Sequence, residues 1–303
     1  MNQINGIPVS IESLRPRAPA TGPFARAPFL SAVTALTGET PTTVTNDSSA
    51  IIVVETDGEI RLAGDSDLTD YHCPLGSEVK SAVAFLVDAA DPGTRFRFDS
   101  LPGDAATEIA DAFAATGVEA SATEHTVAAV VDISSGYDEY LAAIGKKQRH
   151  EVRRKQRRYV DAVGELIHEV HTDEGWALEE FFRLHRLSDG EKGSFMTPVR
   201  EDFFRTLIGQ PGWRLDVLRS PDSDDTATAC LFSYVDDEGV YLYNSSYDRG
   251  LSDASPGVAI VGSMIEQACR EGLARFDFLK GDEVYKFRLG AVARPLFEVV
   301  AVK

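Results

Sequence analysis

The C-terminal part of the sequence holds a dense group of ionisable residues that could perform acid–base chemistry. Residues 276–288 read FDFLKGDEVYKFR, an expected strand end with alternating apolar and acidic residues, followed by a turn. A strand that ends in such a turn is a common setting for a catalytic or binding site. The candidate residues are Asp277, Asp282, Tyr285 and Lys286. The same run could instead form a structural network of ion pairs.

A second candidate site is the helix start at Ser255-Pro256-Gly257. Ser255 is a good N-cap, and Pro256 suits the first helical position because its missing N–H would have no partner there. Gly257 allows a ligand to approach the backbone closely. The free N–H groups of such a helix start can bind a phosphate. Many helices begin this way, but this one follows a strand with three tyrosines at 241, 243 and 247.

The third feature is a strongly basic segment within a long helix expected over residues 137–163. Residues 146–158 carry a net charge of +7. The whole chain has a net charge of −18, so the remaining residues together carry about −25. Seven of the eight basic side chains fall on one half of this helix, and Lys155 is the exception. Such a surface could bind phosphate or carboxylate, or it could simply be a solvated charged face. Repulsion between the like charges favours an anionic ligand.

The elements that must position these residues form two α/β units. Helices and strands alternate over residues 1–130, where AIIVVE at 50–55 predicts a buried strand that ends at an Asp57-Gly58 turn. Residues 131–303 contain the basic helix, three closely spaced strands, a loop, the helix after Pro256, and two further strands. We therefore expect an α/β (α+β) protein of two domains, 1–130 and 131–303.

Composition excludes several classes of protein. No apolar run reaches the roughly 18 residues of a membrane span, and residues 1–17 lack an apolar signal core. The three cysteines and the scattered histidines show no metal-binding spacing, so we expect no metal. The acidic net charge disfavours nucleic acid as a partner. These features predict a soluble cytoplasmic protein.

Together, these segments resemble the CelD/BcsL-like branch of the GNAT acetyltransferases, which is similar in fold to the FemAB peptidyltransferases. The resemblance rests on the basic helix from Gly145, on YLYNSSYD at 241–248, on Ser255-Pro256-Gly257 and on FDFLKGDEVYK at 276–286. It covers residues 130–303 with fair specificity and residues 1–130 loosely. It implies two tandem GNAT-like domains, each a mixed, mainly antiparallel sheet flanked by helices, with the acyltransferase site in the second domain.

The resemblance also implies where an acetyl-CoA or other acyl-CoA donor binds. The pantetheine arm would lie beside the strand at 241–247, and the pyrophosphate would lie at the helix start. The implied cofactor-binding residues are Tyr243, Asn244, Arg249, Ser255, Gly257 and Val258. The loop before this helix departs from the usual glycine-rich pattern, because it carries Asp253 where a cation is expected. Arg249 could supply that cation.

The implied reaction is direct attack of an amine or hydroxyl on the thioester. It needs a base, an oxyanion donor and an acid for the leaving thiolate. Asp248 or Asp277 is the candidate base, Tyr285 the candidate acid, and Lys286 a candidate for charge stabilisation or acceptor binding. The acceptor would be a small molecule, a sugar or a polysaccharide precursor. Its candidate binding residues are Lys147, Arg149, Arg153 and Asp282.

Two other functions remain open from the sequence. A FemAB-like transferase would take an aminoacyl group from charged tRNA, which the basic helix favours and the acidic net charge opposes. A non-catalytic module could keep the fold and use the basic helix to bind an anion. The atypical phosphate loop favours this last alternative.

Overall fold

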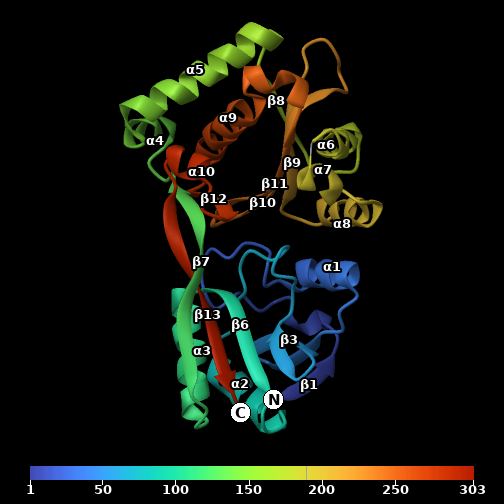
Figure 1. Cartoon of the computed structure of the whole chain (residues 1–303), viewed down its shortest axis with the longest axis vertical. Helices are drawn as coiled ribbons and strands as arrows, with labels where there is room; N and C mark the ends of the chain where they lie inside the picture. Colours follow the sequence, from blue (N-terminus) through green and yellow to red (C-terminus); the bar gives the residue numbers. More distant parts are fainter. Residues whose placement is uncertain (189) are drawn as a thin grey trace. The chain divides into compact units, whose positions relative to one another are not determined.

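The computed structural model describes residues 1–188 and 190–303, which divide into two compact units (Figure 1). The first unit comprises residues 1–128 and 293–303, and the second comprises residues 129–292. In the described part of the chain, no helix is both long and apolar enough to cross a lipid bilayer.

The first unit is built on a mainly antiparallel sheet with the strand order β1-β2-β3-β4-β6-β13-β7. These strands are β1 (Asn2–Asn5), β2 (Thr42–Asn46), β3 (Ser49–Thr56), β4 (Glu59–Leu62), β6 (Arg95–Pro102), β13 (Val292–Val302) and β7 (Ala120–Asp132). The short strand β5 (Leu75–Gly76) pairs with β3. The helices are η1 (Val9–Ile11), α1 (Ala27–Thr37), α2 (Val79–Ala89) and α3 (Gly103–Ala115).

The β3–β4 hairpin confirms the strand and turn predicted at residues 50–58. The first six residues of β3 are buried, and β3 and β4 pair antiparallel up to Thr56 and Glu59. Asp57 and Gly58 between them both have positive φ, 52° and 77°. Asp-Gly is a favoured pair for such a turn because its twist matches that of the flanking strands.

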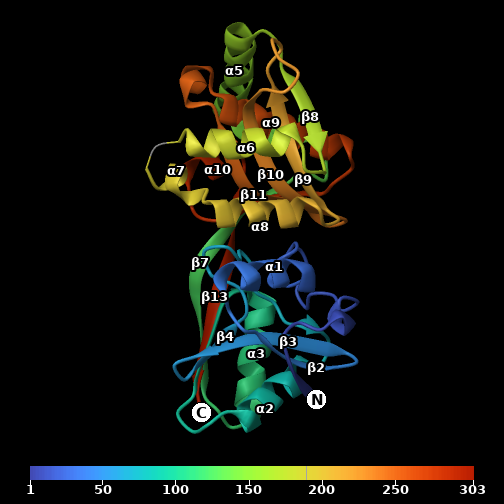
Figure 2. The ribbon, with the colours of Figure 1, turned by 90° about the vertical axis from the view of Figure 1, so that its right-hand side faces the viewer.

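The second unit has the strand order β12-β11-β10-β9-β8, and the last residues of β7 lie next to β12. Its own strands are β8 (Ile167–His171), β9 (Trp213–Arg219), β10 (Ala227–Asp236), β11 (Gly239–Tyr247) and β12 (Arg275–Lys280). Its helices are α4 (Tyr137–Ala143), α5 (Gly145–Val163), α6 (Trp176–Arg186), α7 (Glu191–Phe195), α8 (Pro198–Ile208), η2 (Arg249–Ala254), α9 (Pro256–Arg270) and α10 (Val284–Arg288). Helices α6 to α8 cover one face of β9–β11, and α9 covers the other with α5 outside it (Figure 2).

The neighbouring strands β11 and β12 pair over only part of their length. β11 pairs antiparallel with β10 but parallel with β12, and its described register with β12 comprises Val240↔Phe276 and Tyr241↔Asp277. β11 then continues to Tyr247, whereas β12 ends at Lys280. A register shift between Phe232 and Ser233 of β10 places a bulge in β11 just beyond these pairs. A bulge bends the strand and interrupts its ladder, which often happens next to functional sites.

The helix expected over residues 137–163 is divided in two. Gly145 has φ of +78°, a left-handed conformation that ends α4 and lets α5 start in a new direction. Tyr140 of α4 then donates from its hydroxyl to the carbonyl of Leu289 at 3.0 Å, which ties α4 to the end of α10. The prediction of one continuous helix was therefore wrong at this glycine.

The last strand belongs to the first unit. β13 pairs antiparallel with β6, from Leu296↔Pro102 to Val302↔Arg95. Residues 293–303 therefore depart from the predicted division, in which residues 131–303 form one domain. An apolar pattern indicates that a strand exists, but it does not name the strand with which it pairs.

Candidate functional site

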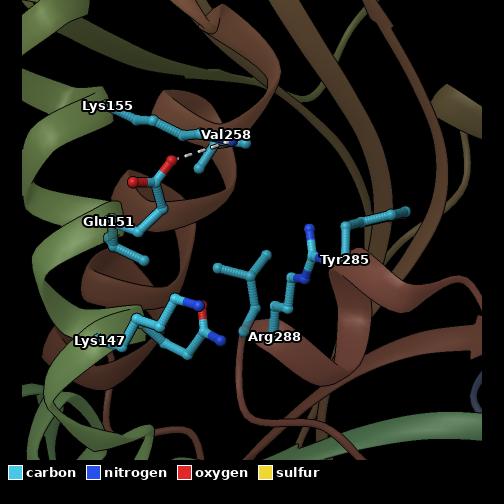
Figure 3. A pocket seen from close by; sticks show the side chains of 9 residues that line it. Lys147, Glu151, Lys155, Val258, Tyr285 and Arg288 are labelled. Atoms are coloured by element: carbon cyan, nitrogen blue, oxygen red, sulfur yellow. Dashed lines mark ion pairs between the residues drawn. The ribbon is translucent and has the colours of Figure 1, made fainter.

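A pocket of about 280 Å³ opens in the second unit between α5, the first turn of α9 and α10 (Figure 3). Helix α5 contributes Lys147, Gln148, Glu151, Val152 and Lys155. The other lining residues are Val258 from α9, and Tyr285, Arg288 and Leu289 from α10 and the residue after it. The three elements are distant in sequence, so only folding brings these side chains together.

Helical periodicity explains why α5 presents Lys147, Glu151 and Lys155 to the pocket. Residues four apart lie on the same face of a helix, one turn after another. The adjacent face of α5 buries Val152 and Tyr159, which belong to the core that α9 also lines. The two helices pack closely at Gly262, where a Cβ atom would lie 2.9 Å from Gln156 Nε2.

The pocket combines three cations with one carboxylate. Lys147, Lys155 and Arg288 supply the positive charges, and Glu151 supplies the negative one. Glu151 Oε1 lies 3.8 Å from Lys155 Nζ, and both of its oxygens accept hydrogen bonds from Arg154. Those hydrogen bonds are the main cause that lowers the pKa of Glu151, so this side chain is ionised at neutral pH. The net lining charge favours an anionic ligand.

The start of α9 reaches the pocket through Val258. Pro256 occupies the first helical position, as expected. Ser255 has a left-handed backbone (φ 59°), and within the described structure its side chain makes no capping hydrogen bond, so the predicted Ser255 N-cap bond was wrong. The carbonyl of Ser255 instead accepts from the backbone N–H groups of Val258 and Ala259, each at 3.1 Å. A Cβ on Gly257 would lie 3.3 Å from the ring of Tyr247, so this glycine is in close contact.

The C-terminal run forms β12 and α10, with a turn between them. Tyr285 lines the pocket from α10 and makes an edge contact with Phe278 of β12 at 6.0 Å between ring centroids. Tyr285 is 46% exposed, and the partial loss of solvent around its ring, with a smaller contribution from Glu283, raises its pKa to about 12. Tyr285 is therefore a protonated hydroxyl over the whole physiological range. Helix α10 was expected as part of a turn, because five residues are too few for a clear helical period.

Asp277 and Lys286 lie in the interior beside this turn. Asp277 is fully buried, and its Oδ1 accepts from the backbone N–H of Leu279 at 2.8 Å. Lys286 is 4% exposed, donates from Nζ to the carbonyl of Lys280 at 2.6 Å, and pairs with Glu283 at 2.9 Å. Both side chains therefore hold the β12–α10 turn, and neither lines the pocket.

The predicted residues of β11 and the following loop occupy several environments. The ring of Tyr243 packs on Trp213 at 5.4 Å between centroids, on the α6–α8 face. Asn244 Oδ1 lies 2.7 Å from His185 Nε2. Asp248 accepts from the N–H of Gly250 at 2.8 Å and thereby caps η2. Arg249 stacks on Tyr247, with 4.4 Å from its guanidinium carbon to the ring centroid.

Of the predicted substrate-binding residues, only Lys147 lines the pocket. Arg149 donates to the carbonyl of Leu141 at 3.0 Å and so links α5 to α4. Arg153 is exposed on the other side of α5, and Asp282 is exposed in the turn after β12. In the described residues, no three histidine, cysteine, aspartate or glutamate side chains are grouped so that they could hold a metal ion.

Comparison with protein families identifies this part of the chain. Residues 146–287 match the family model described as "Acetyltransferase (GNAT) domain". Residues 146–287 form a GNAT domain. The matched segment includes α5, so the basic helix is part of the domain. No curated protein matches the chain.

Solved structures extend the likeness to almost the whole chain. A conserved protein of unknown function from Bacteroides thetaiotaomicron is 12% identical with a TM-score of 0.66, and 97% of this chain and 95% of that chain are covered. L-PGS from Bacillus licheniformis is 14% identical with a TM-score of 0.64 and coverage of 97% and 90%. FemX is 12% identical with a TM-score of 0.63 and coverage of 98% and 97%.

These likenesses confirm the predicted GNAT-superfamily, FemAB-related fold and its α/β class. At these identities the solved structures show the fold alone. Glu151, Lys155 and Arg288 line the pocket but were not among the predicted site residues. The four-residue spacing from Lys147 through Glu151 to Lys155 was the available signal. The position of Arg288 had no such signal, because it depends on how α10 packs.

Proposed function

We propose that this GNAT domain transfers an acyl group from acyl-CoA to an amine or hydroxyl of a small molecule, a sugar or a polysaccharide precursor. The observations that carry the proposal are the basic pocket between α5, the first turn of α9 and α10, and the end of the described β11–β12 pairing at Tyr241↔Asp277 in the same unit. A donor that has a phosphate-bearing end and a long neutral arm matches these two features. A cytoplasmic location, where acyl-CoA is available, is part of the proposal.

The phosphates of the donor would bind in the pocket. Lys147 and Lys155 approach from α5 and Arg288 from α10, while Val258 marks the first turn of α9. Cations and the positive end of a helix both stabilise phosphate. The loop before α9 carries Asp253 where a cation is expected beside the phosphate. Lys147, Lys155 and Arg288 would supply the positive charge in place of Arg249, whose guanidinium stacks on Tyr247.

The acyl-bearing arm would lie where β11 and β12 cease to pair. The bulge in β11 lies at this point, just after Tyr241. A strand whose ladder is interrupted can turn backbone N–H groups towards a ligand, and such groups stabilise the oxyanion of an acyl-transfer intermediate. We place the thioester carbonyl at this bulge.

In the reaction, the acceptor attacks the thioester carbon, so that a new N–C or O–C bond forms and the C–S bond breaks. A base removes the proton of the acceptor, and an acid protonates the departing thiolate. Asp248 is the better placed carboxylate for the base, because it is half-buried at the end of β11, whereas Asp277 is enclosed and holds Leu279. Tyr285, whose hydroxyl stays protonated, is the proposed acid. Lys286 would act indirectly by holding the turn that carries Tyr285.

Thermal unfolding with acetyl-CoA, longer acyl-CoAs and desulfo-CoA tests donor binding. At 100 times its Kd a ligand stabilises the folded state by about 2.7 kcal/mol, which raises Tm by several degrees. We expect this shift in the native protein and a much smaller one in the Lys147→Met/Lys155→Met variant. Release of free CoA thiol in the presence of a panel of amines and sugars then tests transfer. Absence of both a thermal shift and thiol release at millimolar acyl-CoA would overturn the proposal.

A second candidate function is aminoacyl transfer from charged tRNA. The observation that favours it is the outer face of α5, defined by the exposed residues Lys146, Arg153, Arg154, Arg157 and Arg158. A pyrophosphate needs no such surface, whereas a nucleic acid makes many phosphate contacts. Binding of tRNA would therefore weaken steeply with salt, and Arg153→Gln/Arg157→Gln would reduce the slope by about two. Salt-insensitive donor binding that this double variant leaves unchanged would exclude this candidate.

A further inference from the structure

Hydrogen bonds connect a serine, a histidine and an aspartate in the second unit. Oγ of Ser263 in α9 lies 3.0 Å from Nδ1 of His168 in β8. Nε2 of His168 lies 2.8 Å from Oδ1 of Asp216 in β9. All three residues, which we call the triad, lie outside the pocket lined by α5, α9 and α10. A hydroxyl beside a base that a third group orients is the arrangement of an activated nucleophile.

The partners of Asp216 determine where the protons of the triad lie. Asp216 is fully buried, and its Oδ2 accepts from Nε of Arg214 at 2.9 Å. The carboxylate of such an ion pair can only accept hydrogen bonds. Nε2 of His168 therefore carries a proton, which leaves Nδ1 of the neutral imidazole as the acceptor for the hydroxyl of Ser263. In this tautomer the histidine can remove the proton of the serine.

Further contacts hold the aspartate end of the triad in place. Arg214 also donates from Nη1 to both carboxylate oxygens of Glu271, the residue after α9, at 3.1 and 2.9 Å. Glu271 accepts in addition from Nε2 of Gln267 at 3.0 Å. Helix α9 is thus tied to β9 through Arg214 and to β8 through Ser263. Supporting hydrogen bonds of this kind keep a nucleophile and its base at reaction distance.

The serine end of the triad is accessible to a small molecule. Ser263 is half-buried, and the side chain of His168 is 11% exposed. Val170 lies two residues after His168, therefore on the same face of β8, and its 43% exposed side chain offers an apolar surface to a short acyl chain. Gln267 lies one turn after Ser263 on α9. Its amide nitrogen has two hydrogens, of which Glu271 binds one, so the second can stabilise an oxyanion.

We infer that Ser263 is a nucleophile and that the triad hydrolyses short-chain carboxylic esters, an activity separate from acyl transfer in the pocket. Oγ of Ser263 attacks the carbonyl carbon of the ester while its proton moves to Nδ1 of His168. The bond from the carbonyl carbon to the alcohol oxygen then breaks, and His168 gives the proton to the departing alcohol. Asp216 is a positioning residue, because it holds the tautomer of His168 and stabilises the imidazolium that forms.

Water completes the cycle by the same route. It attacks the carbonyl carbon of the acyl–serine ester and gives a proton to Nδ1 of His168. The bond from that carbon to Oγ of Ser263 breaks, and Oγ recovers the proton from His168. An ester and a water molecule thus become a carboxylic acid and an alcohol, with no other reactant.

Hydrolysis of p-nitrophenyl acetate and labelling with diisopropyl fluorophosphate test this inference. Mass spectrometry should find one phosphoryl group per chain, on the peptide that contains Ser263. Ser263→Ala should abolish this label and lower ester hydrolysis by about 10²-fold or more. His168→Gln can still donate to Asp216 but has no base, so it should lower hydrolysis by about 10²–10⁴-fold. Circular dichroism checks that each variant is folded.

The matched control is Ser81→Ala in α2. Ser81 is an exposed helical serine whose hydroxyl lies 3.3 Å from a carboxylate oxygen of Glu78, without a histidine between them. This variant should keep the native label and the native rate of hydrolysis. Asp216→Asn tests the positioning role and should lower kcat about 10²-fold or more with nearly unchanged KM. Native kcat in Asp216→Asn with a lowered Tm would show that Asp216 is only structural and would overturn its part in the triad.

Three results would overturn the inference. They are an unlabelled native protein, a label that falls on other residues than Ser263, and ester hydrolysis that Ser263→Ala leaves at the native rate. Release of CoA thiol from acetyl-CoA is measured in the same variants, because the triad lies outside the pocket. Retained thiol release with lost ester hydrolysis in Ser263→Ala supports a separate site. Equal loss of both activities in this variant would overturn that separation.

Discussion

Arg154 holds the carboxylate of Glu151 through two hydrogen bonds of 2.9 and 2.7 Å, although Arg154 itself does not line the pocket. The carboxylate thus belongs both to the pocket and to the exposed face of α5. Glu151 can contact a ligand in the pocket, whereas Arg154 can only orient the carboxylate of Glu151. Substitution of Arg154 tests this distinction.

The Arg154→Met variant tests that orientation. The carboxylate of Glu151 loses its bidentate partner, so we expect its pKa to rise towards the ordinary value in an NMR titration, because the hydrogen bonds from Arg154 are the main cause that lowers it. The affinity for pyrophosphate should change little, because Lys147, Lys155 and Arg288 remain. Arg157→Met, on the same exposed face, is the control and should leave the pKa of Glu151 nearly unchanged. Equal behaviour of the two variants would contradict an orienting role of Arg154.

The Gly257→Val variant tests the close contact at the start of α9. A Cβ at this position would lie 3.3 Å from the ring of Tyr247, and the branched side chain would crowd the backbone there. We expect donor affinity to fall by at least tenfold while far-UV circular dichroism is unchanged. Gly209→Ala is a suitable control, since a Cβ there has no neighbour closer than 3.8 Å. Native donor affinity in Gly257→Val would contradict a binding role for this helix start.

The pH dependence of Tyr285 follows from its raised pKa. Partial loss of solvent, which leaves Tyr285 46% exposed, raises its pKa from the usual value of about 10 to about 12, so the folded state favours the protonated form. Its contribution to stability is therefore complete below pH 10 and declines as the pH rises towards 12. An acid with this pKa gives no alkaline fall in kcat between pH 7 and about 10. We expect Tyr285→Phe to lower kcat about 10²-fold or more across this range, with little change in the thermal shift caused by desulfo-CoA.

Lys286 should be structural, as its contacts indicate. Its ammonium group donates to the carbonyl of Lys280 and pairs with Glu283 in a nearly buried position. Lys286→Met keeps most of the side-chain volume and removes the hydrogen bond, so it should lower the free energy of unfolding by about 1–3 kcal/mol in urea titrations. A variant of native stability that has lost activity would instead assign Lys286 a direct role in the reaction.

Local features of the fold were predicted well because their causes lie within a few residues. The Asp57-Gly58 turn, the helix start at Pro256 and the strand order from β9 to β11 each follow from turn chemistry, fixed backbone angles or apolar patterning. The break at Gly145 and the five-residue helix α10 were missed. The presence of a single glycine in a sequence does not show that its φ will be positive. A helix of five residues is too short to show the helical period of apolar residues.

The candidate site was predicted only in part. Lys147, Val258 and Tyr285 line the pocket and were selected from the sequence, whereas Glu151, Lys155 and Arg288 were not. Asp277 and Lys286 were selected as ionisable residues beside a strand end, but their contacts are with the backbone of the turn. The residue type indicates the chemistry that a side chain could perform. Burial and hydrogen bonds within the fold determine whether its polar atoms are still accessible to a ligand.

By itself, the sequence determined the concentration of positive charge on residues 146–158, the helix start at Pro256 and the GNAT-like order of elements. Only the tertiary structure decided that one face of α5 meets α10 across the start of α9, and that β13 returns to the first unit. The physical reason is that turns and periodicity depend on neighbours in the chain. A pocket depends on side-chain packing between helices such as α5 and α9, which the complementarity of Val152, Gln156 and Gly262 sets.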